Sequence, residues 1–234
     1  MSLLTIIQSV CRRVGHPPPT SVIGNADETT QRLLEISEDE GRELARYGNW
    51  KVLRREHTFI TTATESQTNT HTPPDMAAFI DRTIWNRTTK RRLIGPLSSE
   101  EYQNYKANVS FPMLDTFYLR GTTWLMNPVP TAGNTIAYEY RSSYWCKKAS
   151  DSTLQETWLA DTDLGVLPER LMELGIIWRY KQARGLDWAT DYDKYGFQVQ
   201  QALAADQPRG VVDMSGDGPN YPTGIYVPDY NWTL

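Results

Sequence analysis

Two consecutive stretches near the end of the chain show the clearest helical spacing of apolar residues. The first begins after Pro168, which suits a first helical turn because its missing N–H costs nothing there, and it ends at Gly185. The second begins after Asp187, a potential N-cap, and ends before Pro208 and Gly210. The apolar stripes are Leu167, Leu171, Leu174 and Trp178 in the first stretch and Trp188, Tyr192, Tyr195, Val199 and Leu203 in the second. Three further apolar residues of the first helix lie off its main stripe and indicate burial on more than one side: Met172, Ile176 and Ile177.

Two more helices are predicted at the N-terminal end. Ser2 is a potential N-cap for the first, which ends at Gly15 before three prolines. The second runs from about Asp27 to Tyr47, where Gly48 follows. Within it the small residues Ser37 and Gly41 would let a neighbouring helix approach closely. Because no other strong helical pattern exists, we expect the two ends of the chain to pack together, with the middle of the chain inserted between them.

The middle of the chain changes from helical to alternating periodicity after Trp50. Predicted strands cover His57 to Thr62, about Ala78 to Asn86, Lys90 to Ile94, a hairpin turning near Arg120 to Thr122, and a strand with Ile136, Tyr138 and Tyr140. Ser98 and Glu101 form a capping-box pattern for a short helix through about Lys106. The pattern therefore predicts an α+β fold: a bundle of N- and C-terminal helices, an inserted, mostly antiparallel β domain and an extended C-terminal arm. The expected boundaries are residues 1–50 and 151–205 for the helical unit, 51–150 for the β domain and 206–234 for the arm.

The predicted arm combines residues that prevent a helix with residues that bind well at interfaces. Prolines and glycines recur throughout it, yet it keeps the aromatic side chains Tyr221, Tyr226, Tyr230 and Trp232. A solvated tail does not need that much aromatic surface. We expect it to dock on another protein chain, and the alternative is that it lies back on its own subunit.

Composition and charge exclude several classes of protein. The 234 residues carry a net charge of −4, so the chain has no overall basic footprint for wrapping nucleic acid. No segment approaches the roughly 20 apolar residues of a membrane span, and the N-terminus lacks the features of a signal peptide. We therefore expect a soluble, intracellular protein with no membrane partner. Cys11 and Cys146 are interpreted as buried thiols of a reducing compartment.

Two local clusters of charge stand out. The helix from Asp27 to Tyr47 has seven acidic and three basic residues on its predicted exposed side, including Glu38, Asp39, Glu40 and Glu43. A solvated face is the ordinary interpretation, and a functional acidic surface is the alternative. The opposite cluster lies in the predicted hairpin and contains Arg82, Arg87, Lys90, Arg91 and Arg92 against Asp81 alone. It either pairs with acidic helices of its own or a neighbouring subunit, or contacts phosphates.

Signals for catalysis, cofactors and metals are weak. No glycine-rich phosphate loop lies between a strand and a helix, and His16, His57 and His71 belong to no nucleophile motif. Asp161 with Asp163, and Asp191 with Asp193, have metal-like spacing but lack the glycine and distal glutamate of a calcium loop. We expect capping or solvated roles for these aspartates, and no enzyme activity, cofactor or metal.

Several stretches together resemble one family. The order of segments is similar to phage head-to-tail adaptor (connector) proteins of short-tailed phages, the group that contains tail tubular protein A. The resemblance spans the chain to about Ala205 and lies in SLLTIIQSVCRRVGHPPP, EGRELARYGNW, FIDRTIWNRTTKRRLIGPLSSEEY, YEYRSSYWC and LPERLMELGIIWRYKQARGLDWATDYDKY.

The resemblance implies a structural virion protein at the head–tail junction, made in the host cytoplasm. Subunits of that family form a ring, commonly a dodecamer, which docks on the portal protein, presents a surface to the tail nozzle protein and extends the channel for the genomic DNA without binding it specifically. A ring needs two complementary faces on each subunit. The basic residues Arg82, Arg87, Lys90, Arg91 and Arg92 and the acidic residues Glu38, Asp39 and Glu43 are our candidates for them. The alternatives are a head-completion protein of a longer-tailed phage and a DNA-binding module that uses the basic hairpin.

Overall fold

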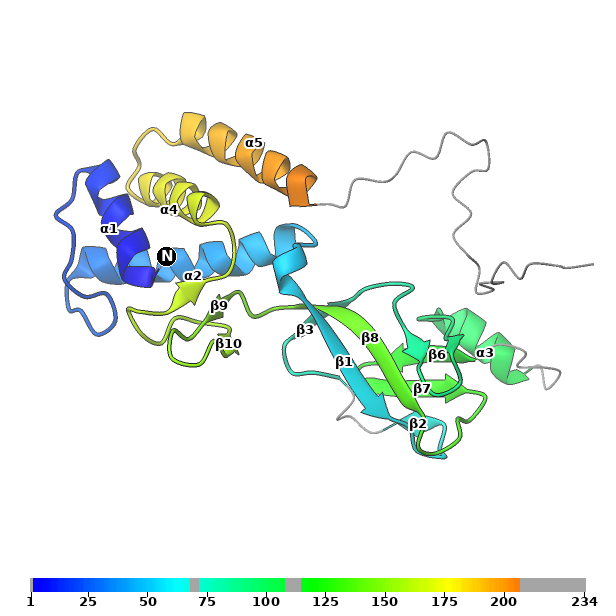
Figure 1. The fold of residues 1–234 in the computed structure, drawn as a ribbon. Coiled ribbons are helices and arrows are strands. Elements are labelled where there is room, and N and C mark those ends of the chain that lie inside the picture. The colour runs from blue at the N-terminus through cyan, green and yellow to red at the C-terminus, as the bar shows by residue number, and fades with distance from the viewer. Residues whose placement is uncertain (1, 68–71, 108–114, 207–234) are drawn as a thin grey trace, which may run out of the picture. The chain divides into compact units, whose positions relative to one another are not determined.

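The structure is a computed structural model that describes residues 2–67, 72–107 and 115–206 (Figure 1). Helices and antiparallel sheets are both present, so the predicted α+β class is confirmed. The described chain forms two compact units. We call residues 2–55, 74–79 and 140–206 the helical unit, and residues 56–73 and 80–139, apart from their undescribed positions, the sheet unit. The predicted arm with Tyr221, Tyr226, Tyr230 and Trp232 lies outside the described residues.

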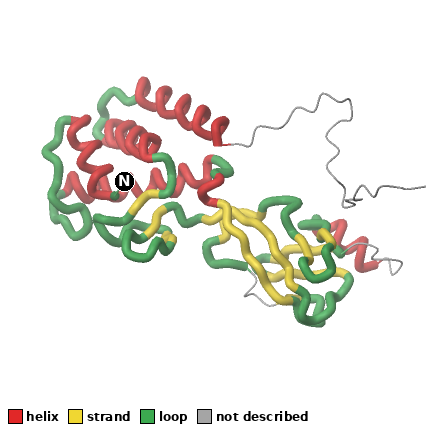
Figure 2. The backbone as a smooth tube through the Cα atoms, in the orientation of Figure 1, coloured by secondary structure: helices red, strands yellow, loops and turns green. Residues whose placement is uncertain are grey.

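The helical unit contains the four long helices that the described residues form, drawn in red in Figure 2. They are α1 (Leu3–Val14), α2 (Glu28–Tyr47), α4 (Glu169–Ala183) and α5 (Ala189–Asp206), with a short 3-10 turn, η1, at Lys51–Leu53. The unit also holds β3 (Met76–Phe79) and a small sheet in the order β10 (Leu154–Gln155), β9 (Cys146–Lys147) and β11 (Leu164–Gly165).

Helix α4 is the centre of the helical unit. It contacts α1, α2 and α5 (Figure 1), and its apolar residues are buried on several sides, as the sequence predicts. The buried members are Leu171, Met172, Leu174, Ile176, Ile177 and Trp178. They belong to one continuous core that also includes residues of α1, α2 and α5. The two ends of the chain therefore pack together.

The ends of α1 and the start of α2 follow the predicted capping chemistry, whereas α5 begins at Ala189, one residue later than a cap at Asp187 would give. The Ser2 hydroxyl accepts a hydrogen bond from the Thr5 N–H, and Gly15 adopts a left-handed conformation with φ 80°. Asp27 caps α2 by accepting a 2.9 Å hydrogen bond from the Thr30 N–H. The expectation for Gly41 was wrong, because an added Cβ at this position would overlap the indole ring of Trp145, not a neighbouring helix.

The sheet unit contains short strands and one short helix. They are β2 (Ser66–Gln67), β4 (Trp85–Asn86), β5 (Arg91–Arg92), α3 (Ser99–Ala107), β6 (Thr116–Arg120) and β7 (Thr123–Asn127). Strands β1 (Arg54–Ile60) and β8 (Thr135–Ser142) run across the division between the units. The larger sheet has the order β1-β8-β4-β5, with β3 also paired to β8, and the smaller has the order β2-β7-β6. All pairings for which a register is defined are antiparallel.

Aromatic rings fill the interior of the sheet unit. Trp124 lies against Phe117, with ring centroids 5.1 Å apart, and against Tyr138 at 4.8 Å. Phe59 of β1 lies 5.7 Å from the Trp124 ring. Burial does not alternate strictly along these strands, because three consecutive residues of β7 and of β8 are buried.

The predictions for the middle of the chain are confirmed at the turns and wrong for one strand. The β6–β7 hairpin turns at Gly121, and the capping box forms, since Glu101 accepts from the Ser98 N–H at 2.8 Å and Ser98 accepts from the Glu101 N–H at 3.2 Å. The single strand expected from about residue 78 to 86 is two strands, β3 and β4. A turn separates them, in which Arg82 has a φ of 66°, and this left-handed backbone interrupts the ladder.

Candidate assembly surfaces

The basic hairpin, residues 85–92, lies at one end of the strand order of the larger sheet. Trp85 pairs with Arg92 and Asn86 with Arg91, which places β5 at the end of the strand order. The Asn86 side chain accepts 3.0 Å hydrogen bonds from the backbone N–H groups of Thr88 and Thr89, and so closes the turn. Further hydrogen bonds to Thr135 of β8 hold the turn in place. The cations on this turn therefore have a fixed backbone beneath them.

The charges of the hairpin are largely uncompensated. Arg87 forms a 2.8 Å ion pair with Glu56, and both side chains are half exposed. Lys90, Arg91 and Arg92 are exposed, and within the described residues none of them forms an ion pair. Charged side chains on an edge strand also prevent pairing with other sheets. The structure brings four of the five predicted basic residues into one hairpin.

Arg82, the fifth predicted residue, does not belong to the hairpin. It is exposed in the turn between β3 and β4, and its left-handed backbone explains why the strand pattern fails there.

A recess of about 190 Å³ lies beside the hairpin, and the sequence did not indicate it. Arg91 and Thr89 line one side of it, and the segment Pro128–Pro130 lines another. This recess gives the basic surface a place for an inserted side chain.

The predicted acidic residues lie on α2 in the helical unit. Glu38 forms a 3.0 Å ion pair with Arg42, Asp39 lies 3.5 Å from the same guanidinium, and Glu43 lies 2.6 Å from Arg179. The side chain of Glu38 is only 23% exposed, whereas those of Asp39 and Glu43 are 66% and 63% exposed. All three carboxylates are partly neutralised inside their own unit, and Asp39 and Glu43 are the accessible ones.

Glu40 corrects the prediction of a wholly exposed acidic side. It is fully buried, accepting hydrogen bonds from Arg179 Nε at 2.8 Å and from the Tyr195 hydroxyl at 2.6 Å. Desolvation raises the pKa of Glu40 to about 7, against the opposing effect of these two hydrogen bonds. The signal was present in the sequence, because Glu40 falls on the same helical stripe as Leu33, Ser37 and Leu44.

A second buried carboxylate was not predicted. Glu173 of α4 is 5% exposed, accepts hydrogen bonds from the hydroxyl of Ser9 and, at 3.2 Å, from the guanidinium group of Arg170, and forms a 3.1 Å ion pair with Arg13. It thereby connects α1 with α4. Its position inside the apolar run from Leu171 to Ile177 was the signal for its burial.

The residues considered for chemistry have structural roles. Asp161 accepts hydrogen bonds from the Val22 and Ile23 N–H groups at 3.0 and 2.8 Å, and Asp163 accepts from those of Leu159 and Ala160. Across the described ranges no three or more His, Cys, Asp or Glu side chains are grouped so that they could hold a metal ion. No described helix combines the length and the hydropathy needed to cross a bilayer.

The predicted burial of both cysteines is confirmed. Neither forms a disulfide, and burial raises the pKa of both thiols, that of Cys146 to about 12. His16 is paired with the Tyr180 hydroxyl at 2.6 Å, which is a structural contact. His71 lies outside the described residues.

Comparison with known proteins decides the family. A model described as SU10 adaptor protein matches residues 1–221. The chain belongs to the SU10 adaptor protein family. The predicted kinship with phage head-to-tail adaptors is thereby confirmed, while the closer likeness to tail tubular protein A stays a prediction. A search of curated proteins finds no match.

Membership in this family gives the surfaces a context. An adaptor is a structural component of the virion that contacts other virion components such as the portal and the tail. The adaptor needs faces for protein partners, and the described residues offer exposed charge on α2 and on the basic hairpin.

Proposed function

We propose that this adaptor assembles into a closed ring between the portal and the tail nozzle and extends the channel through which the genomic DNA leaves the head. The observation that carries the proposal is the rigid, exposed basic hairpin on a chain whose family match covers residues 1–221. We propose that the protein is a structural subunit with no enzymatic role. Adaptors of short-tailed phages, which this chain resembles, commonly form rings of twelve subunits, and we therefore propose a dodecamer.

The ring is closed by two different faces of each subunit. Lys90, Arg91 and Arg92 of one subunit meet Asp39 and Glu43 of the next. Opposite charges in this arrangement align the subunits and accelerate their encounter, and like charges at the same place disfavour wrong pairings. Three other candidates contribute less to the ring contact: Arg82, Arg87 and Glu38. Glu38 is mostly covered, and Arg87 already forms an ion pair within its own subunit.

The C-terminal segment supplies a separate contact. Tyr221, Tyr226, Tyr230 and Trp232 are the anchors that we propose dock on the portal or on a neighbouring subunit. The DNA passes through the lumen without specific binding, which the net charge of −4 supports because it disfavours a tight phosphate contact along the whole chain.

The test is electron microscopy of the adaptor mixed with its purified portal. We expect particles in which a ring of adaptor subunits caps one end of the portal, and light scattering of the adaptor alone should give a monomer or small oligomer. A mixture without any portal-bound adaptor would contradict the proposal. If a tail-completion complex of a longer-tailed phage binds beneath the ring in place of a nozzle, the head-completion alternative is correct.

A DNA-binding module is the second candidate, and the uncompensated charge of Lys90, Arg91 and Arg92 is the observation that favours it. Binding to a labelled DNA duplex, measured over a range of salt concentrations, separates the two. Phosphate contacts give an affinity that falls steeply as salt increases. A ring subunit that does not bind DNA specifically should show little affinity for the duplex at every salt concentration measured.

A further inference from the structure

The helical unit contains a pocket of about 360 Å³ that neither the predicted surfaces nor the family accounts for. It lies between the last turns of α2 and the segments around β3 and the end of β8. We call it the arginine pocket, because three arginines, two alanines and one glutamate line it together with two serines: Arg42, Arg46 and Arg141, Ala45 and Ala77, and Glu156.

Two of the three guanidinium groups have no anionic partner in the described chain. Arg42 is paired with Glu38 and Asp39. Arg46 forms no ion pair with any described residue, and Arg141 donates only to the Gly48 carbonyl, at 3.2 Å. The Nε of Arg141 is buried and has no hydrogen-bond partner within the described residues. A buried donor of this kind is costly unless something accepts from it.

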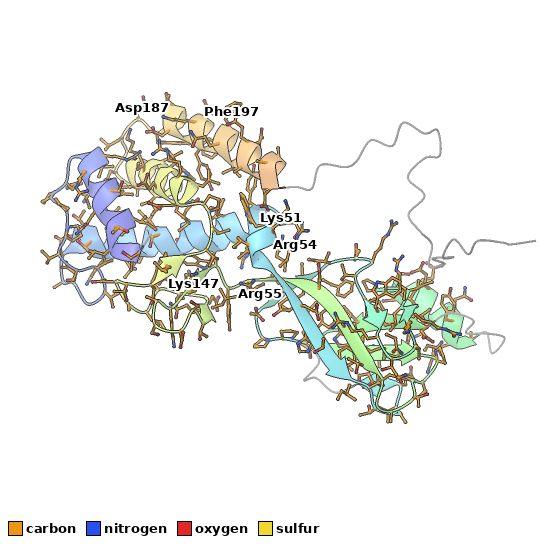
Figure 3. All side chains as sticks on the ribbon, viewed as in Figure 1. Lys51, Arg54, Arg55, Lys147, Asp187 and Phe197 are labelled. Atoms are coloured by element: carbon orange, nitrogen blue, oxygen red, sulfur yellow. The ribbon has the colours of Figure 1, made fainter. Side chains whose placement is uncertain are left out.

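The chain that leads from α2 into β1 is also basic. From Arg42 to Arg55 there are five basic residues, Glu43 being the acidic one, and Figure 3 labels Lys51, Arg54 and Arg55 where α2 gives way to β1. Within the described ranges these three form no ion pair. Glu156 on the lining is exposed and forms no ion pair with a described residue either, so it does not neutralise the guanidinium groups through a direct contact.

The backbone that carries Arg141 is held firmly. Asp75 is buried and accepts hydrogen bonds from the Ser142 hydroxyl at 2.6 Å and the Tyr140 hydroxyl at 2.9 Å. The Ser143 N–H donates to the Asp75 carbonyl at 2.7 Å. Because the serine hydroxyls are engaged with Asp75, the donors left for a ligand are those of the arginines.

We propose that the arginine pocket binds a carboxylate side chain supplied by a second protein chain. Guanidinium groups present paired N–H donors that match the two oxygens of a carboxylate, and such charge-assisted hydrogen bonds are stronger than neutral ones. A recess of this volume accommodates one side chain, with Ala45 and Ala77 offering contact to its methylene groups.

A protein carboxylate fits this surface better than a nucleic acid. A DNA duplex carries one charge per roughly 1.7 Å of its axis, so it brings many phosphates to any surface that it covers. The same helix exposes Glu35, Asp39 and Glu43, which would repel such a row of phosphates. A single acidic side chain brings only one charge to the arginines, so its repulsion by those carboxylates is much smaller. The proposal does not depend on ring formation or on the basic hairpin.

The test measures binding of a short labelled peptide that carries one glutamate among glycine and serine residues, with a labelled DNA duplex as the competing probe. We expect the adaptor to bind the peptide and the double variant Arg46→Gln, Arg141→Gln to bind it at least about tenfold more weakly, the loss typical of one charge-assisted hydrogen bond. Arg12→Gln with Lys194→Gln removes the same charge at two exposed positions of the helical unit that do not line the pocket, and should leave peptide binding unchanged. Glu156→Gln should strengthen it.

Arg46→Gln alone protects the test against misfolding, because Arg46 is exposed and has no described ion pair. This single variant should keep the thermal midpoint of the wild type and still bind the peptide more weakly. Equal peptide binding by wild type and pocket variants overturns the proposal. A pocket variant that loses DNA affinity while keeping peptide affinity overturns it as well, in favour of a phosphate site.

Discussion

Tyr195 of α5 donates a 2.6 Å hydrogen bond to Glu40 of α2, a residue 155 positions earlier in the chain. The other oxygen of the same carboxylate accepts from Arg179 of α4, so one buried side chain joins three helices. Burying a charged group is costly, and partners that satisfy its hydrogen bonds reduce that cost. The contact therefore makes the packing of α5 sensitive to the protonation state of Glu40.

The stability of the helical unit should depend on pH through Glu40. Its pKa is raised to about 7 in the folded chain from an ordinary value of 4.5, so the folded state keeps a proton that the unfolded chain loses. The resulting stabilisation is complete below pH 4.5 and is lost as the pH rises through about 7. Between these limits the free energy of unfolding of the wild type should fall by roughly 3 kcal/mol relative to that of Glu40→Gln.

Urea unfolding of both proteins across this pH range measures the difference, and Glu43→Gln is the control, because it removes an exposed partner of the same arginine. Parallel pH profiles of the wild type and Glu40→Gln would show that the carboxylate stays ionised in the folded chain.

Gly175 should not tolerate a side chain. A Cβ at this position on α4 would overlap the carboxyl group of Glu40, which is itself held by Tyr195 and Arg179. We expect Gly175→Ala to destabilise the protein by about 1–3 kcal/mol, as overpacking of a filled core does, although alanine is the better helix former.

Gly196→Ala is the matched control for Gly175→Ala. Gly196 also lies in a helix, α5, and an added Cβ would meet no atom within 4 Å. This variant should be neutral or stabilising by up to about 1 kcal/mol. Thermal unfolding distinguishes the two, and a stabilising Gly175→Ala would mean that α2 and α4 separate more easily than the structure indicates.

Reversing the charge of the basic hairpin should impair assembly without unfolding the subunit. Arg91→Glu with Arg92→Glu places carboxylates opposite Asp39 and Glu43 in the proposed ring contact, and like charges across a contact are costly. Both arginines are exposed and unpaired in the described chain, so the thermal midpoint of the monomer should change little.

Ring formation on the portal, counted in micrographs, is the measurement for the hairpin variant. Arg12→Glu with Lys194→Glu makes the same change in net charge at two exposed positions of the helical unit and should assemble normally. If the hairpin variant assembles like the wild type and loses affinity for DNA, the nucleic-acid interpretation replaces the ring contact.

Removing the chain from Gly210 onward should separate attachment from folding. The core of the helical unit is formed by described residues that end at Val199, so the thermal midpoint of the truncated subunit should stay close to that of the full chain. Attachment to the portal should be lost or strongly weakened, because the truncation removes the four aromatic anchors Tyr221, Tyr226, Tyr230 and Trp232 together. Co-sedimentation with the portal measures it. A truncated protein that melts earlier and still attaches would assign the segment to its own subunit.

Local chemistry explains what the sequence predicted well. The caps at Ser2 and Asp27 and the box at Ser98 and Glu101 depend on residues three positions apart, so their hydrogen bonds can be inferred without the fold. The β6–β7 hairpin is likewise fixed by Gly121 between two alternating runs.

Long-range contacts explain what it missed. Glu40 was assigned to the solvent because its partners Arg179 and Tyr195 come from the other end of the chain. The arginine pocket combines Arg42 and Arg46, one helical turn apart, with Arg141 of a distant strand. The helical spacing of the first two was a readable signal, but only the fold shows that a third guanidinium lies beside them.

The central position of α4 has a consequence for the order of synthesis. The partners of this helix on α1 and α2 leave the ribosome first, whereas Glu169–Ala183 follows only after the whole sheet unit has been made. Until then Leu3, Ile6, Ile7 and Val10 lack the surface that covers them, as the contact between Ser9 and Glu173, 164 positions apart, illustrates. The sheet unit can therefore fold while the chain is still growing, but the helical unit closes only after α4 has been synthesised. A chain that terminates before α4 leaves an apolar surface that invites aggregation or degradation, so only subunits that include α4 are available for the virion.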